Sequence, residues 1–224
     1  MNIVITGCSK GIGFELAKLL SLNHKVYGIS RDEKQLKKLK SAVEIPENIC
    51  FYVGDVVKIN QLDLNQWIPD EGIDVLVNNA GYLVNKTFKD ISHADFLKTM
   101  EVNLWGAINM SQLLIDKLTY SSGQIINIGS IGGVNYSSKY SGLSLYSSSK
   151  GALTTLSECL AEELNIKVNV LALGAVQTEM LSEAFPGYQA DVSPKEMAEF
   201  ILDFINNGSK IINGQIIKVT KSNP

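Results

Sequence analysis

The chain has 224 residues, of which 45% are hydrophobic and 19% charged, and its formal net charge at pH 7 is −3. A chain of this size and composition can bury one well-filled core, so we expect a single domain spanning residues 1–224. The slightly acidic balance argues against nucleic-acid partners, because proteins that bind phosphate backbones usually carry a basic excess.

The cysteine and leader patterns are typical of an intracellular protein. Cys8, Cys50 and Cys159 are odd in number and widely spaced, and the two histidines are isolated, so we expect neither a disulfide framework nor a metal site. The apolar run Ile3–Ile5 begins too early to leave space for a signal sequence. No apolar run approaches the roughly 18 to 20 residues that span a bilayer. We therefore expect a cytoplasmic protein with no membrane partner.

Short apolar runs alternate with longer segments of helical periodicity, which predicts parallel strands joined by crossover helices. The expected strands are Ile3–Ile5, Lys25–Ile29, Ile49–Val53, Val75–Asn78, Gln124–Ile128, Val168–Leu173 and Gln215–Val219. The expected helices are Gly11–Leu22, Glu33–Lys40, Ala94–Leu118, Tyr146–Leu164 and Pro194–Asn206. This order predicts an α/β fold: a Rossmann-type, doubly wound, seven-stranded parallel sheet with helices on both faces. Its ligand crevice should lie at the carboxyl ends of the strands.

The segment 179–193 follows the sixth expected strand and differs from the rest of the chain. It contains Phe185 and Tyr188 around a Pro-Gly pair, and we expect it to form a movable lid over a substrate. Together with Tyr136, Tyr140 and Leu143, these two aromatic residues are candidates for a mostly apolar substrate pocket. Packing or subunit contact is the alternative role for all five.

A glycine-rich motif, Thr6–Gly13, lies between the first expected strand and the first expected helix. Its three glycines allow a tight turn that presents backbone N–H groups to a pyrophosphate at the helix N-terminus. The spacing differs from the commoner G-x-G-x-x-G pattern. A purely structural turn is the alternative explanation.

Tyr146 and Lys150 are four residues apart, so on one helix they share a face. A tyrosine hydroxyl has a pKa near 10 and is a poor base at neutral pH, but a neighbouring ammonium lowers that pKa. We therefore expect Lys150 to activate Tyr146 as a proton-transfer group. An ordinary helix pair with no catalytic role is the alternative.

Several motifs occur together in one order: Thr6–Gly13, Asp55-Val56, Asn78–Gly81, Asn103, Ser130, and Tyr146 with Lys150. In these motifs, and over essentially its whole length, the chain resembles the short-chain dehydrogenase/reductases. The resemblance implies a Rossmann-fold oxidoreductase that transfers a hydride between a nicotinamide cofactor and a carbonyl or secondary alcohol.

The resemblance also implies roles for individual residues. Tyr146 would exchange the proton with the substrate oxygen, Ser130 would hold that oxygen, Lys150 would also bind the nicotinamide ribose, and Asn103 would order a water in the proton relay. Implied cofactor contacts are Gly7, Ser9, Lys10, Gly11, Ile12, Gly13, Arg31, Asp55, Val56, Asn79, Ala80, Gly81, Tyr146, Lys150, Gly174, Val176 and Thr178. The chain departs from the family pattern at Leu173, where a proline is usual.

The end of the second strand bears on the choice of cofactor. NAD-preferring relatives place an acid where this chain has Ser30, and Arg31 and Lys10 supply two cations nearby. A guanidinium suits a 2′-phosphate, so we expect NADP(H). Asp32 is the counter-argument, because a shift of one residue would bring it to the ribose and favour NAD(H).

These observations favour an NADP(H)-dependent carbonyl or ketoacyl reductase, with ketoacyl thioesters, keto sugars and small ketones all open as substrates. The alternatives are an NAD-linked alcohol dehydrogenase and a non-catalytic NADP-binding regulator. A sugar-nucleotide epimerase is disfavoured by the short C-terminal part. By analogy with the family, we expect a homodimer or homotetramer formed through the helices Ala94–Leu118 and Tyr146–Leu164.

Overall fold

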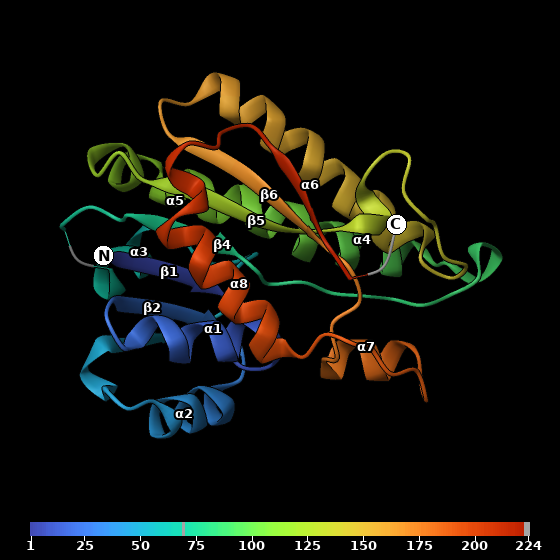
Figure 1. The fold of residues 1–224 in the computed structure, drawn as a ribbon, viewed down its shortest axis with the longest axis horizontal. Coiled ribbons are helices and arrows are strands. Elements are labelled where there is room, and N and C mark those ends of the chain that lie inside the picture. The colour runs from blue at the N-terminus through green and yellow to red at the C-terminus, as the bar shows by residue number, and fades with distance from the viewer. Residues whose placement is uncertain (69, 222–224) are drawn as a thin grey trace.

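The structure is a computed structural model and describes residues 1–68 and 70–221. A seven-stranded parallel sheet runs through the molecule in the order β3-β2-β1-β4-β5-β6-β7 (Figure 1). Its strands are β1 (Asn2–Thr6), β2 (Lys25–Ser30), β3 (Ile49–Val53), β4 (Val75–Asn78), β5 (Gln124–Ser130), β6 (Lys167–Leu173) and β7 (Ile216–Val219). The strand order changes direction between β1 and β4, which is where ligands bind in sheets of this type.

Helices cover both faces of the sheet (Figure 1). They are α1 (Gly11–Ser21), α2 (Glu33–Ala42), α3 (Gln61–Trp67), α4 (His93–Met100), α5 (Gly106–Tyr120), α6 (Ser144–Glu163), α7 (Glu179–Ala184) and α8 (Pro194–Asn206). None of the helices in the described ranges is long and apolar enough to cross a membrane.

The alternation of side chains along β1 explains the two cores. Ile3 and Ile5 point to one face and belong to a buried cluster with residues of α1, α2 and α8, while Val4 points to the other face and belongs to a cluster with residues of α3 and α5. Because both faces are covered, the central strands read as continuous apolar runs rather than alternating ones. The predicted fold class is confirmed.

The expected helix Ala94–Leu118 was wrong as a single α-helix. A π segment, Glu101–Trp105, separates α4 from α5, and the N–H of Gly106 donates to the carbonyl of Glu101 five residues earlier. One wide turn of this kind hardly disturbs hydrophobic periodicity, so the sequence pattern did not reveal it. Such turns are frequent at functional sites, and this one contains Asn103.

Candidate active site

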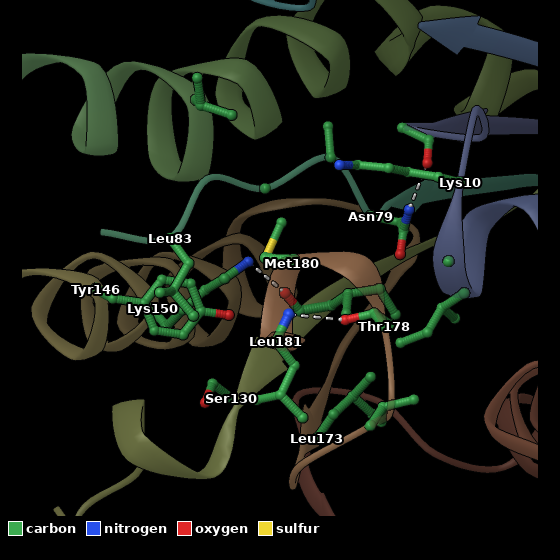
Figure 2. Close-up of a pocket in the computed structure, with 18 of the residues that line it drawn as sticks. Lys10, Asn79, Leu83, Ser130, Tyr146, Lys150, Leu173, Thr178, Met180 and Leu181 are labelled. Atoms are coloured by element: carbon green, nitrogen blue, oxygen red, sulfur yellow. Dashed lines mark hydrogen bonds between the residues drawn. The ribbon is translucent and has the colours of Figure 1, made fainter. Parts of the chain in front are cut away.

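A pocket of about 480 Å³ opens at the carboxyl ends of the strands. Figure 2 shows Tyr146, Lys150 and Leu83 grouped at one end, and Lys10 and Asn79 at the other. Of the predicted cofactor residues, the pocket is lined by Gly7, Ser9, Lys10, Gly11, Ile12, Arg31, Asp55, Val56, Asn79, Ala80, Gly81, Tyr146, Lys150, Gly174, Val176 and Thr178. Residues from distant parts of the chain therefore meet in one cavity.

The glycine-rich loop leaves the start of α1 open to the pocket. The N-cap residue Lys10 makes no side-chain capping bond, and the first turn of α1 carries no acidic residue. By contrast, side chains cap α2, α3, α4, α7 and α8. The N-terminal N–H groups of α1 thus lack an internal side-chain acceptor, and the helix dipole there favours an anion. This arrangement fits the pyrophosphate of a dinucleotide.

Close packing around the loop requires glycine at two positions. Gly7 has a φ of 71°, and a Cβ there would lie 2.8 Å from the Cα of Ala80. A Cβ on Gly13 would lie 2.4 Å from the carbonyl oxygen of Gly7. Gly13 itself is not among the residues that line the pocket. Glycine at this position allows α1 to lie close to the loop.

Thr6 and Asn79 lock the loop to the end of β4. The Thr6 hydroxyl accepts hydrogen bonds from the backbone N–H groups of Asn79, at 3.0 Å, and Ala80, at 2.9 Å. In return, the side-chain amide of Asn79 donates to the carbonyls of Thr6, at 3.0 Å, and Gly7, at 3.1 Å. The Asn79 side chain therefore holds the shape of the glycine-rich loop, whichever ligand the loop binds.

Tyr146, Lys150 and Ser130 gather at the other end of the pocket. Lys150 is 3% exposed, and its Nζ donates to the carbonyl of Ile128 on β5 at 2.8 Å. That Nζ lies 5.9 Å from the centre of the Tyr146 ring on the same helix. Ser130 ends β5, lines the same cavity, and its Oγ accepts from the N–H of Gly132 at 3.3 Å. The predicted grouping of these three residues is present.

Burial controls the protonation of this pair. It raises the pKa of Tyr146 to about 12 and lowers the pKa of Lys150 to about 8, because each charged form loses contact with water. The expectation that Lys150 lowers the pKa of Tyr146 is therefore not met in this structure, because desolvation raises that pKa. At neutral pH, Tyr146 therefore carries its proton.

Asn103 lies beside this group but does not line the pocket. It is 1% exposed, and its Oδ1 accepts from the N–H of Tyr82 at 2.7 Å. The position that a Cβ of Gly81 would take lies 3.6 Å from the Asn103 Oδ1 and 3.8 Å from the Lys150 Nζ. Asn103 and Lys150 therefore approach the same point behind the pocket wall.

The cations and acids predicted to select the cofactor occupy different environments. Arg31 is exposed at the pocket edge, and Lys10 forms a 3.8 Å ion pair with Glu183 of α7. The Asp32 side chain caps α2 by accepting from the N–H of Gln35 at 3.0 Å, and Asp32 is not among the lining residues. The Asp55 Oδ1 accepts from the N–H of Val57 at 3.1 Å, so Asp55 combines a turn role with a place in the pocket wall.

The loop after β6 reaches the pocket despite the missing proline. Leu173 ends the strand in register with Ser130 on one side and Val219 on the other, and the N–H of Gly174 donates to the Val219 carbonyl at 2.9 Å. Thr178 then caps α7 by accepting from the N–H of Leu181 at 3.3 Å (Figure 2). Sheet pairing thus fixes the start of this loop.

The pocket is mostly apolar. Tyr140, Leu143, Phe185 and Tyr188 line it as predicted, whereas Tyr136 is fully exposed and does not. The lining residues that sequence reasoning did not single out include Leu83, Met180 and Leu181. Met180 and Leu181 belong to the short helix α7, inside the segment predicted as a lid, while no motif marked Leu83.

A sequence profile described as short chain dehydrogenase matches residues 1–189. The chain belongs to the short-chain dehydrogenase family. It is therefore an NAD(P)-dependent oxidoreductase that acts on CH–OH and C=O groups. Among curated relatives, it is similar to the 3-oxoacyl-[acyl-carrier-protein] reductase FabG of Chlamydia trachomatis serovar D, at 28% identity over 96% of this chain and 94% of the relative.

Solved structures share the fold of this short-chain dehydrogenase. ElxO with NADP bound has a TM-score of 0.81 at 27% identity, covering 97% of this chain and 96% of its own. The 3-ketoacyl-(acyl-carrier-protein) reductase from Brucella melitensis complexed with NADH has a TM-score of 0.84 at 23% identity, covering 97% and 96%. Similar structures thus hold either nicotinamide dinucleotide.

Proposed function

We propose that this short-chain dehydrogenase is an NADP(H)-dependent carbonyl reductase. The observation that carries the proposal is that Tyr146, Lys150 and Ser130 share one pocket with an uncapped helix N-terminus. NADPH, when bound, would supply the hydride. Gly7, Gly11 and the α1 N-terminus would hold its phosphates, and Gly174, Val176 and Thr178 would contact its nicotinamide end.

In the proposed reaction, the protein positions one oxygen and moves one proton. Ser130 would donate a hydrogen bond to the carbonyl oxygen of the substrate, and the Tyr146 hydroxyl would protonate that oxygen as it becomes an alcohol. Lys150, held on the Ile128 carbonyl, would place its positive charge beside the developing phenolate. Asn103 would order a water that returns a proton to the site.

Two features support NADP(H) over NAD(H). Arg31 stands exposed at the pocket edge, where it is able to meet a 2′-phosphate, and Lys10 lies across the same pocket. Asp32, the acid that would favour NAD(H), is engaged as the cap of α2.

We also propose that the chain forms a single domain in which the 179–193 segment acts as a lid. We further propose that the protein works in the cytoplasm and forms an oligomer with at least one other copy of itself. The lid supplies Met180, Leu181, Phe185 and Tyr188 to the pocket. Three free cysteines are compatible with a reducing compartment.

The decisive experiment begins with fluorescence titration of the purified protein with NADPH and NADH. Consumption of the better ligand is then followed against small ketones, keto sugars and ketoacyl thioesters. Tighter binding of NADPH together with turnover of a carbonyl compound is the expected result. Tighter binding of NADH would instead favour an NAD-linked alcohol dehydrogenase. Tight binding without turnover of any compound would point to a regulator.

A further inference from the structure

The side-chain amide of Asn103 is held by hydrogen bonds on both of its ends. Its Oδ1 accepts from the Tyr82 N–H at 2.7 Å, and its Nδ2 donates to the Tyr82 carbonyl at 2.9 Å. The second Nδ2 hydrogen is donated to the Oγ of Ser149, also at 2.9 Å. Tyr82 therefore provides two contacts from the backbone, and Ser149 provides a contact from a side chain.

Ser149 can accept from Asn103 but has no hydrogen left to donate to it. Its hydroxyl donates to the Tyr146 carbonyl at 2.7 Å, and a serine hydroxyl has a single hydrogen. Towards Asn103 the hydroxyl must therefore be an acceptor, which requires the NH₂ end of the amide to face Ser149. The Ser149 side chain is fully buried, so water does not compete for this contact.

This orientation decides which end of the Asn103 amide lies near the pocket wall. With the NH₂ end turned to Ser149 and Tyr82, the Oδ1 lies 3.6 Å from the position that a Cβ of Gly81 would take. A flipped amide would leave the Tyr82 N–H without its acceptor.

We propose that Ser149 is a positioning residue for the proton relay: it fixes the Asn103 side-chain amide, and with it the π segment, against the helix that carries Tyr146 and Lys150. The proposal rests on the proposed function, because the relay is the part of the site that Asn103 serves. Ser149 touches neither the pocket nor the reacting atoms and acts through Asn103. A single hydroxyl thus ties the π segment to the turn of α6 that carries both Tyr146 and Lys150.

The same helix offers a matched control in Ser157. It is 2% exposed, its Oγ donates to the Leu153 carbonyl at 2.6 Å, and it accepts from the Nδ2 of the buried Asn127 at 2.8 Å. Ser157 lies eight residues after Ser149, which is about 12 Å along a helix at about 1.5 Å per residue. Ser149→Ala and Ser157→Ala therefore remove equivalent buried contacts, but only the first contact belongs to the site.

The test compares steady-state kinetics and thermal unfolding of the two variants with the wild type. We expect both to lower the melting temperature by a similar amount. Only Ser149→Ala should lower kcat, by about tenfold, and only this variant should move the alkaline limb of the pH profile. The KM for NADPH should stay within about twofold of the wild-type value in both variants. Ser149→Thr, which keeps a hydroxyl, should recover most of the lost kcat. An unchanged kcat and pH profile in Ser149→Ala, or the same kinetic loss in Ser157→Ala, would overturn the proposal.

A second measurement does not depend on turnover. The side-chain NH₂ signals of Asn103 are observed by NMR on asparagine-labelled protein and assigned by their loss in Asn103→Ala. They should shift and exchange faster with solvent in Ser149→Ala but not in Ser157→Ala. Unaltered signals would contradict the positioning role. A wild-type protein that reduces no carbonyl compound while these signals respond as expected would instead contradict the proposed function and leave the contact established.

Discussion

Lys150 is a charged side chain in a buried position, where loss of contact with water disfavours the charged form of its ammonium group. The ammonium is 3% exposed and is compensated by one backbone carbonyl, and burial lowers its pKa to about 8. A lysine with an ordinary pKa near 10.4 would stay charged across the whole working range. Here the charge of the site changes close to neutrality, so its chemistry becomes sensitive to pH.

The pH profile of carbonyl reduction should show this titration. Because Tyr146 keeps its proton up to about pH 12, loss of the Lys150 charge is the first event as the pH rises. We expect kcat/KM to be level below pH 7 and to fall by up to about tenfold per pH unit above pH 8. Lys150→Arg, whose guanidinium stays charged, should move this limb upward. A profile that stays level to pH 10 in the wild type would contradict the assignment.

We expect cofactor choice to depend most on Arg31. Arg31→Ala should weaken NADPH binding by about 10- to 100-fold, which is the effect of losing a charged hydrogen bond, and leave NADH binding unchanged. Fluorescence titration with both cofactors measures the two affinities. Lys34→Ala is the matched control, because Lys34 is an exposed cation three residues later that lies outside the pocket lining. Equal weakening of both cofactors would show that Arg31 does not read the 2′-phosphate.

At the scale of elements, the segment that begins with α7 forms part of the pocket wall. Phe185 follows the last turn of α7 and lines the pocket, as do Met180 and Leu181 within the helix. The segment is linked to the glycine-rich loop by the ion pair between Lys10 and Glu183, whose side chains are 51% and 74% exposed. An exposed pair of this kind adds little stability.

Phe185→Ala should raise the KM for a ketone by about tenfold, because apolar contact with the substrate is lost, while the Kd for NADPH stays unchanged. Steady-state kinetics with the ketone that the wild type reduces fastest measures the KM, and fluorescence titration measures the Kd for NADPH. Tyr136→Ala provides the comparison, since Tyr136 is fully exposed and lies outside the pocket. An unaltered KM in Phe185→Ala would remove this segment from the substrate site.

The elements differed in how far the sequence could predict them. Strands β1 to β7 were readable because strands buried on both faces form continuous apolar runs between glycine and polar turns. The π segment at Asn103 and the six-residue helix α7 were not readable. The first preserves the apolar pattern of its neighbours, and the second depends on one cap at Thr178 rather than on periodicity.

At the scale of the whole molecule, the motifs predicted which residues meet, but not how each one acts. Most predicted cofactor residues do line one pocket, because parallel strands deliver their carboxyl ends to one edge. The packing role of Gly13 and the contact between Asn103 and Ser149 depend on distances between elements, which the sequence does not encode locally. The pKa of Tyr146 was misjudged for the same reason: its burial is a property of the assembled fold.

The exposed apolar residues of α4 and the π segment support pairing of two copies. Phe96, Leu97 and Trp105 are 45%, 43% and 42% exposed. Light scattering after size exclusion should find at least a dimer, and Leu97→Asp should shift it to monomer. Phe200→Asp should leave the oligomeric state unchanged. Phe200 is similarly exposed, at 40%, but it lies on α8, which packs on the opposite face of the sheet. A monomeric wild type would contradict the pairing.

The most direct test of the central claim is the rate of NADPH-dependent ketone reduction by Tyr146→Phe, measured beside its NADPH affinity. The substitution removes one hydroxyl and keeps the ring, so the pocket shape is preserved. We predict that kcat falls by about 10²- to 10⁴-fold, the contribution of a general acid, while NADPH binds as in the wild type. A variant that retains activity within about tenfold of the wild type would contradict the account, because the proton would then come from another group.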